Sequence, residues 1–323
     1  MMELAALIAL ALLLDATFGD PHGRFHPVAL FGRAAGRMER LCRAAFGGGI
    51  ASGFVGWFLL VFGSAAAAWG LVRFFDAGNP VLGLAAAAGC VYLTVALRSL
   101  LEHAGAIRRP LRNGDLAAAR RALAMIVSRD TATLGESEIV RGGVESLGEN
   151  LTDAVTSPLF FAVLGYLLGG LPGAAAGAVF LRAINTLDAC WGYRDERYLR
   201  FGRVAARTDD AAHWLPARLT LAAIAFAAML CGMRPAAALK AGIRHRHDHL
   251  SPNSCWGMAG FAGALGIRLG GPTVYGGVME PYPYWGDGRS DLNVNDLCRA
   301  ERLTAASALV FAAMIAGLGD LCL

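Results

Sequence analysis

Three carboxylates spaced four residues apart have the clearest capacity for chemistry in this chain. Glu145, Glu149 and Asp153 lie in the segment ESLGENLTD, and residues four apart share one face of a helix. Like charges at that spacing repel by roughly 0.2–0.5 kcal/mol per pair, so we expect Arg141 or a cation to offset them. A solvated helix face with an Arg–Glu pair is the simpler interpretation. Against it, the stripe leads directly into an apolar stretch, and acidic groups beside a membrane are costly and commonly functional.

Polar residues from other segments could complete such a site. They are acids, amides, arginines, a serine and a histidine, which can bind phosphate or carboxylate groups or move protons. The candidates are Arg129, Asn150, Asn185, Asp188, Arg207, Asp209, Asp210, Arg218, His249, Ser251 and Asn253. A solvated arginine-rich loop is the alternative interpretation around Asn185. His245 and His249 could chelate a metal, but no carboxylate or cysteine completes that set.

The composition indicates an integral membrane protein. Of 323 residues, 56% are hydrophobic and 17% charged, and the mean hydropathy is +0.48. The net charge of +4 gives no reason to expect a nucleic-acid partner. Lys240 is the only lysine, which excludes a GxxxxGK[ST] phosphate loop. The seven cysteines are scattered, and no CxxC pair occurs. We therefore interpret them as small apolar side chains and not as a disulfide framework or a zinc site.

Apolar stretches and arginine-rich loops predict the topology. Leu4–Phe18 is short for a full span, whereas Phe54–Val72, Pro80–Leu97 and Leu303–Leu318 are predicted membrane helices. Val155–Leu181 is interrupted by GGLPG and is flanked by arginines at both ends. Since arginine-rich loops stay in the cytoplasm, we predict a re-entrant hairpin there, with its irregular turn buried in protein.

The polar segments are therefore expected on one side of the membrane. Leu219–Met233 has only fifteen residues, which leaves open whether it crosses. We see no internal repeat and no soluble domain boundary. The sequence predicts one all-α, polytopic membrane domain over residues 1–323, with helical hairpins, a re-entrant hairpin and cytoplasmic polar loops.

Nine short motifs, in order along the chain, resemble those of the CobD/CbiB family. They are GDP at 19–21, HPV at 26–28, SRDT at 128–131, ESLGEN..DA..SPLF at 145–160, NTLD at 185–188, GYR at 192–194, DD…PARLT at 209–220, SPN at 251–253 and LGGP..YGG at 269–277. One tripeptide would mean little, but nine in sequence are specific. The resemblance covers nearly the whole chain.

The resemblance implies a reaction of cobalamin biosynthesis. The family comprises adenosylcobinamide-phosphate synthases, membrane ligases that join adenosylcobyric acid to aminopropanol phosphate or a related amino alcohol. ATP as co-substrate and Mg²⁺ are implied with that activity. The expected location is the inner membrane, with multiple spans and an active site facing the cytoplasm. Contact with other cobalamin assembly enzymes is an open expectation.

Residue chemistry then assigns provisional roles within that reaction. Mg²⁺ prefers oxygen ligands, and the expected metal ligands are Glu149, Asp153 and Asp188. The expected catalytic residues are Glu145, Glu149, Asp188, Asp209 and Asp210. Substrate binding is expected from Arg129, Asn150, Asn185, Arg207, Arg218, His249, Ser251 and Asn253. We expect all of them to meet in one pocket.

Two other classes of function remain open. Broken helices with polar ends are typical of transporters, which makes a corrinoid transporter the alternative, although transporters usually show matched repeats. A non-catalytic membrane partner with the same fold is the third hypothesis.

Overall fold

The chain forms two compact units, each assembled from separate stretches of sequence. The computed structural model describes residues 2–21, 23 and 26–321. Unit 1 comprises Met1–Ala96, Ser157–His213 and Ile315–Leu323, and unit 2 comprises Leu97–Thr156 and Trp214–Met314. The prediction of one domain over residues 1–323 stays a prediction.

All regular secondary structure in the described residues of unit 1 is helical. The helices are α1 (Met2–Phe18), α2 (Pro27–Phe46), α3 (Ile50–Gly78), α4 (Pro80–Tyr92), α8 (Ser157–Trp191), α9 (Arg203–Ala212) and the last residues of α13 (Val294–Leu321). Pro27 and Pro80 each begin a helix, where the missing N–H has no cost. The Asn79 side chain accepts a 2.8 Å hydrogen bond from the backbone N–H of Val81 and so caps α4.

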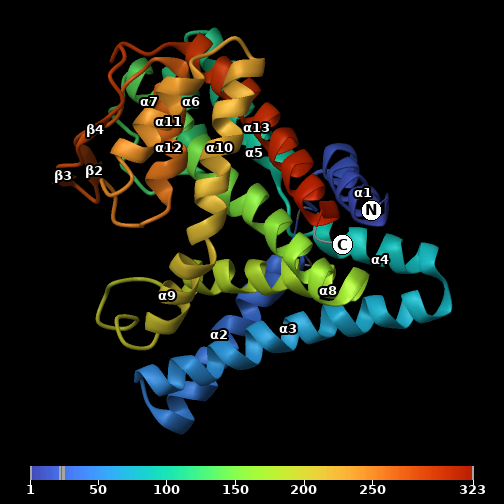
Figure 1. Ribbon diagram of the computed structural model, residues 1–323. Helices are drawn as coiled ribbons and strands as arrows, with labels where there is room; N and C mark the ends of the chain where they lie inside the picture. The colour runs from blue at the N-terminus through green and yellow to red at the C-terminus, as the bar shows by residue number, and fades with distance from the viewer. Residues whose placement is uncertain (1, 22, 24–25, 322–323) are drawn as a thin grey trace. The chain divides into compact units, whose positions relative to one another are not determined.

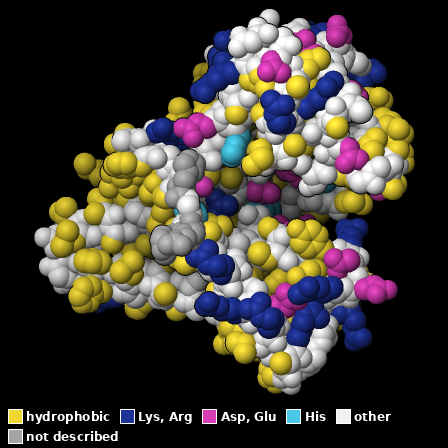
Figure 2. Space-filling view, turned by 180° about the vertical axis from the view of Figure 1, so that it is seen from behind, with side chains coloured by type: hydrophobic (Ala, Val, Ile, Leu, Met, Phe, Trp, Pro, Cys, Tyr) yellow, Lys and Arg dark blue, Asp and Glu magenta, His cyan; other side chains and the backbone are white. Residues whose placement is uncertain are grey.

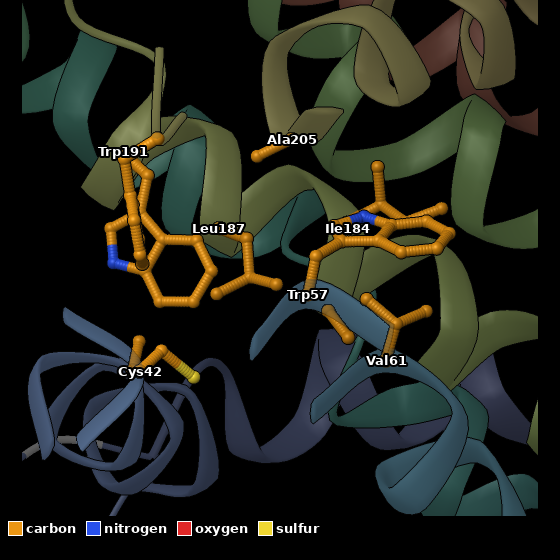
Figure 3. Close-up of a cluster of buried hydrophobic side chains, with 10 residues drawn as sticks. Cys42, Trp57, Val61, Ile184, Leu187, Trp191 and Ala205 are labelled. Carbon is orange, nitrogen blue, oxygen red and sulfur yellow. The ribbon is translucent and has the colours of Figure 1, made fainter. Parts of the chain in front are cut away.

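The core of unit 1 forms where α3 packs along α8 (Figure 1). Trp57 and Val61 of α3 meet Ile184, Leu187 and Trp191 of α8 in a buried apolar cluster (Figure 3). Burying such side chains stabilises a fold by about 1.5–3 kcal/mol each. This cluster fixes the end of α8 that carries the NTLD motif.

Helix α8 is broken in the middle and folds back on itself. Gly169 and Gly170 have non-helical backbone angles, and φ of Gly170 is +62°, a region that favours glycine. The two halves then pack at glycines: a Cβ on Gly173 would lie 2.1 Å from the Gly165 carbonyl oxygen, and one on Gly177 2.1 Å from that of Phe161. The predicted hairpin at GGLPG is therefore confirmed as a tight pair of half-helices. The expectation that its turn is buried in protein is wrong, because Leu168 is 83% exposed and Gly169 is exposed as well. The re-entrant position of the hairpin in the membrane stays a prediction.

Unit 2 contains the remaining helices and four very short strands. The helices are α5 (Leu97–Arg112), α6 (Leu116–Ala124), α7 (Glu136–Leu151), α10 (Trp214–Leu230), α11 (Pro235–Arg244), α12 (Ser254–Leu265) and most of α13. Strand β1 (Leu269–Gly270) pairs with β4 (Tyr284–Trp285), and β2 (Thr273–Tyr275) pairs with β3 (Val278–Glu280), both antiparallel. Helix α12 packs against α7, α10 and α11.

A π-helical turn, η1 (Thr152–Thr156), follows α7 directly. Its hydroxyls anchor it to α10, since Thr156 Oγ1 lies 2.6 Å from Thr220 Oγ1. The Thr220 hydroxyl also donates a 2.8 Å bond to the Pro216 carbonyl. Such turns wind more loosely than an α-helix and occur frequently at functional sites. Because of its looser winding, side chains from residue 152 onward do not continue the faces of α7 as they would in a regular α-helix.

The prediction of an all-α, polytopic membrane protein is confirmed. Five helical stretches of the described chain are long and apolar enough to cross a membrane; they are Ile50–Gly78, Pro80–Arg112, Glu136–Trp191, Arg203–Leu230 and Val294–Gly319. On α3 the large side chains Phe58, Phe62, Trp69 and Phe74 are exposed. Yellow side chains cover much of the surface in Figure 2, as a lipid-facing surface requires.

We predict that Gly173→Ala destabilises unit 1, because the added Cβ would collide with the Gly165 backbone in the α8 hairpin. The expected loss is about 1–3 kcal/mol, typical of overpacking, measured by thermal unfolding of the purified protein in detergent. Gly63→Ala on α3 is the matched control, since a Cβ there meets nothing within 4 Å. Equal behaviour of the two variants would contradict the hairpin packing.

Candidate functional site

A cavity of about 240 Å³ in unit 2 contains the best-defined cluster of ionisable groups. Arg129, Glu145, Glu149 and His249 all line it. Arg129 Nη2 lies 2.5 Å from Glu145 Oε2, and both side chains are largely buried. Glu145 Oε1 accepts a 2.7 Å bond from the Gly270 N–H. Both oxygens of Glu145 are therefore engaged, and this carboxylate joins the SRDT loop, α7 and β1.

The cation that balances Glu145 is Arg129, not Arg141 as expected. Arg141 instead donates from Nη1 to the Gly270 carbonyl at 2.9 Å. Burial by itself lowers the pKa of Arg129, but the adjacent Glu145 carboxylate outweighs burial and raises it. Arg129 therefore keeps its positive charge inside the protein, next to the Glu145 carboxyl group.

Glu149 is held differently from Glu145. Its Oε1 accepts a 2.9 Å hydrogen bond from the Ser254 hydroxyl at the start of α12. This contact is within reach because α7 and α12 cross at two glycines: a Cβ on Gly257 would lie 2.1 Å from the Gly148 carbonyl oxygen. With a single neutral donor, Glu149 keeps capacity to accept a proton or a positive charge.

Aromatic rings form another wall of the cavity. Tyr275, Tyr282 and Trp285 from the strand region line it, and the His249 ring stacks on Tyr282 with centroids 5.5 Å apart. Burial raises the pKa of both tyrosines, so they are neutral donors at neutral pH. A wall of aromatic faces beside a carboxylate suits an organic cation.

Glycines allow the strand region to approach the ion pair. Gly270 and Gly271 have φ of +71° and +85°, and a Cβ on Gly271 would lie 2.2 Å from the Tyr284 ring. Asp130 then fastens the β2–β3 hairpin, since its Oδ2 accepts a 2.7 Å bond from the Gly277 N–H. The SRDT and LGGP..YGG motifs are therefore parts of one wall.

The predicted acidic stripe ends at Glu149. Asp153 lies in the π-helical turn and does not line the cavity. A regular α-helix would have placed it one turn beyond Glu149 on the same face, and the looser turn removes it. Asn150 points back along its own helix, donating from Nδ2 to the Ser146 carbonyl at 2.9 Å.

Arg218 and the SPN motif form a second group in unit 2, outside that cavity. The guanidinium carbon of Arg218 lies 4.0 Å from the Trp214 ring centroid and 4.6 Å from that of Trp256. Its Nη1 lies 3.4 Å from Asn253 Oδ1. Ser251 Oγ accepts a 3.3 Å bond from the Asn253 N–H. These residues hold Arg218 between two aromatic faces, as its planar group favours.

Unit 1 carries its own acidic cluster at the end of α8 and along α9. Asn185 Nδ2 donates to Asp209 Oδ1 at 3.3 Å, and Nδ1 of the buried His213 lies 3.3 Å from the same oxygen. Asp188 interacts electrostatically with Asp209 and Asp210. Gly192 leaves room for Asp188, because a Cβ there would lie 2.0 Å from Asp188 Oδ1. Three mutually repelling carboxylates favour a bound cation.

A buried glutamate holds the loop that connects α8 to α9. Glu39 Oε1 accepts from Arg43 Nε and Arg197 Nε, each at 2.9 Å, and Oε2 accepts from the Tyr198 hydroxyl at 3.1 Å. Burial alone raises the pKa of Glu39, but these hydrogen bonds lower it further than burial raises it. Glu39 thereby positions the segment next to Asp188.

The predicted site residues thus fall into two sets. Unit 2 contains Arg129, Glu145, Glu149, Asn150, Asp153, Arg218, His249, Ser251 and Asn253, and unit 1 contains Asn185, Asp188, Arg207, Asp209 and Asp210. Arg207 is exposed on α9 and interacts electrostatically with Asp210. The expectation of one shared pocket stays a prediction.

No group of three or more His, Cys, Asp or Glu side chains within the described part of the chain could hold a metal ion by itself. His245 is engaged at both ring nitrogens: Nδ1 lies 2.8 Å from Asp248 Oδ2, and Nε2 accepts from the Gly286 N–H at 3.4 Å. A Mg²⁺ ion needs only one or two protein carboxylates when phosphates and water complete its shell. The carboxylates present could bind Mg²⁺ together with phosphate and water, but they do not form a site made of protein ligands alone.

Sequence reasoning missed several residues of the unit 2 cavity. Ser254, Tyr282 and Trp285 are not among the predicted site residues, and Gly270 enters the prediction only as part of the LGGP..YGG motif. Ser254 directly follows the SPN motif, which was an available signal. The aromatic residues carried none, because the strands that hold them are too short for a periodic pattern.

We predict that Arg129→Met destabilises the protein by about 3 kcal/mol, because it leaves the Glu145 carboxylate buried without its partner. Arg98→Met removes an exposed ion pair with Glu102 and should cost less than about 1 kcal/mol. Thermal unfolding in detergent measures both, and replacing Glu145 by Gln in the Arg129→Met background should recover part of the loss. Similar losses for the two single variants would show that the buried pair has no special role.

A family model described as CobD/Cbib protein matches residues 8–304. The chain is 40% identical over 311 residues to cobalamin biosynthesis protein CbiB of Salmonella typhimurium, with 95% of each chain covered. It is 40% identical over 314 residues to cobalamin biosynthesis protein CobD of Klebsiella pneumoniae, with 94% of each covered. No solved structure matches significantly. Full-length similarity at this identity shows that the chain belongs to the CobD/CbiB family.

Proposed function

We propose that this chain acts in cobalamin biosynthesis as an ATP-dependent ligase that forms an amide bond. Its substrates would be a carboxylate of adenosylcobyric acid and the amine of aminopropanol phosphate or a related amino alcohol phosphate. The names of the CbiB and CobD relatives support the pathway. The observation that carries the reaction is the unit 2 cavity, in which Glu149 lies beside the buried Arg129–Glu145 pair.

The proposed reaction has two steps. The corrinoid carboxylate oxygen attacks the γ-phosphorus of ATP, which releases ADP and forms an acyl phosphate. The amine then attacks the acyl carbon, the C–O bond to phosphate breaks, and inorganic phosphate leaves as the amide forms. The ammonium form of the substrate must lose one proton before its nitrogen can attack, and the nitrogen loses a second proton as the amide forms, which requires a base within hydrogen-bond reach.

The geometry distinguishes the roles of the two glutamates. Glu145 uses both oxygens on Arg129 and Gly270, so its role is to position that wall. Glu149 accepts one hydroxyl hydrogen bond, so it is the better candidate to bind the ammonium group and take its proton. Two carboxylates with different partners are a common way to separate such roles.

Mg²⁺ bound with ATP would supply charge neutralisation for the transferred phosphoryl group. In unit 1, Asp188 and Asp209 are the acids best suited to bind it, since Asp188 faces like charges and Asp209 is oriented by Asn185. The set of Glu149, Asp153 and Asp188 stays a proposal. Arg207 and Arg218 are proposed to contact phosphate or carboxylate oxygens, and Asn150, His249, Ser251 and Asn253 remain proposed binding residues.

A cytoplasmic active site in the inner membrane belongs to the same proposal. It is supported by the arginine-rich segments that flank the apolar stretches, because such loops stay in the cytoplasm. ATP and the amino alcohol phosphate are then available on that side.

We expect Glu149→Gln to lower formation of the amide product at least about 100-fold, the usual loss for a general base. Purified protein is assayed with adenosylcobyric acid, amino alcohol phosphate, ATP and Mg²⁺, and the product is measured by mass spectrometry. The control is Glu102→Gln, which changes an exposed glutamate of unit 2. Full activity of Glu149→Gln would remove this residue from the reaction.

Asp188→Asn should abolish product formation while the protein still folds, because it removes a carboxylate from the proposed Mg²⁺ site. Glu196→Gln, in the exposed loop of the same unit, is the matched control. A loss that higher Mg²⁺ concentrations partly restore would support the metal role, whereas unchanged activity and unchanged Mg²⁺ dependence would contradict it.

The break in α8 supports a corrinoid transporter as the second candidate, because discontinuous helices occur at transporter binding sites. The decisive genetic test is deletion of the gene. The ligase proposal expects cobinamide, but not cobyric acid, to restore cobalamin synthesis. Uptake of labelled corrinoid by vesicles containing the protein, without ATP consumption, would favour transport instead.

A further inference from the structure

Unit 2 contains a second and larger cavity, of about 630 Å³. It lies between the SRDT loop, the first turns of α7 and the β2–β3 hairpin. The polar and apolar residues that matter here are Arg129, Thr131, Thr133, Arg141, Thr273 and Met279. Arg129 lines this cavity and the acidic cavity that contains Glu149, so the two cavities share one wall.

Arg141 is the unbalanced charge in this wall. Its Nη1 donates to the Gly270 carbonyl, its Nε is buried without a hydrogen-bond partner, and it forms no ion pair with any described carboxylate. Arg129 also has spare hydrogen-bond donors, since its Nε and Nη1 atoms are buried and have no hydrogen-bond partner. A half-buried guanidinium without a counter-charge is costly, which indicates that an anion completes this site.

The other charged residues of this cavity serve the backbone. Asp130 accepts the Gly277 N–H at 2.7 Å, and Glu138 accepts the Gly135 N–H at 2.9 Å at the start of α7. These carboxylates still limit how much negative charge the cavity tolerates, so a single phosphate fits better than a polyphosphate. Thr131 and Thr133 add hydroxyl donors of the kind that bind phosphate oxygens.

We propose that the Arg141 cavity binds the phosphate group of a small phosphomonoester whose amine reaches the adjacent Glu149 cavity. The ligand class is therefore a zwitterion with a phosphate at one end and a primary ammonium at the other. Arginine forks bind phosphate through two parallel hydrogen bonds, while Glu149 and the aromatic wall bind the cation. This inference rests on the proposed function, in which an amino alcohol phosphate is the amine donor.

The test compares binding and kinetics in the full-length protein. Arg141→Gln should raise the KM for aminopropanol phosphate roughly ten- to a hundredfold, the range for losing charged hydrogen bonds, and leave the KM for ATP unchanged. Arg141→Lys should recover part of the effect, because it keeps the charge but not the fork. Arg121→Gln, exposed on α6, is the control.

Direct binding separates this inference from the proposed function. By calorimetry, wild-type protein should bind aminopropanol phosphate more tightly than aminopropanol, and Arg141→Gln should lose that preference, whether or not the preparation makes product. A preference retained in Arg141→Gln, or a KM effect on ATP alone, would overturn the assignment. A wild-type protein that shows the preference but no ligation would refute the proposed reaction and leave the phosphate site standing.

Discussion

The buried ion pair between Arg129 and Glu145 is the interaction on which the unit 2 cavity depends. It joins a loop that precedes α7 to the middle of that helix, and Glu145 extends the connection to Gly270. Removing either partner would leave an uncompensated charge inside the protein. Replacing both by apolar residues could preserve stability, so the pair is better explained by the geometry it imposes on the cavity than by net stabilisation.

The second constraint on the structure is the close approach of helix backbones at glycines. The crossing of α7 and α12 at Gly148 and Gly257 brings Ser254 to Glu149. The α8 hairpin uses the same device at Gly165 and Gly173. Small residues at helix crossings are typical of membrane proteins, in which association relies on van der Waals packing rather than on the hydrophobic effect. Polar groups can then be placed accurately within apolar surroundings.

Part of this arrangement could be predicted from the sequence. The GGLPG interruption correctly predicted the hairpin, because glycine and proline break helices locally. The spacing of Glu145 and Glu149 correctly placed both on one face. The prediction of Arg141 as the partner of Glu145 was wrong, because helical spacing shows only neighbours on the same helix, whereas Arg129 reaches Glu145 from a loop through tertiary contacts. The π-helical turn that removes Asp153 from the stripe has no signal in residue spacing.

The most direct test of the account is to follow an oxygen atom from the corrinoid carboxylate. Adenosylcobyric acid labelled with ¹⁸O in that carboxylate is incubated with purified protein, aminopropanol phosphate, ATP and Mg²⁺. If ATP activates the carboxylate, one ¹⁸O atom appears in inorganic phosphate for each adenosylcobinamide phosphate formed. Product formation without ATP, or phosphate release without transfer of the label, would contradict the proposed ligase.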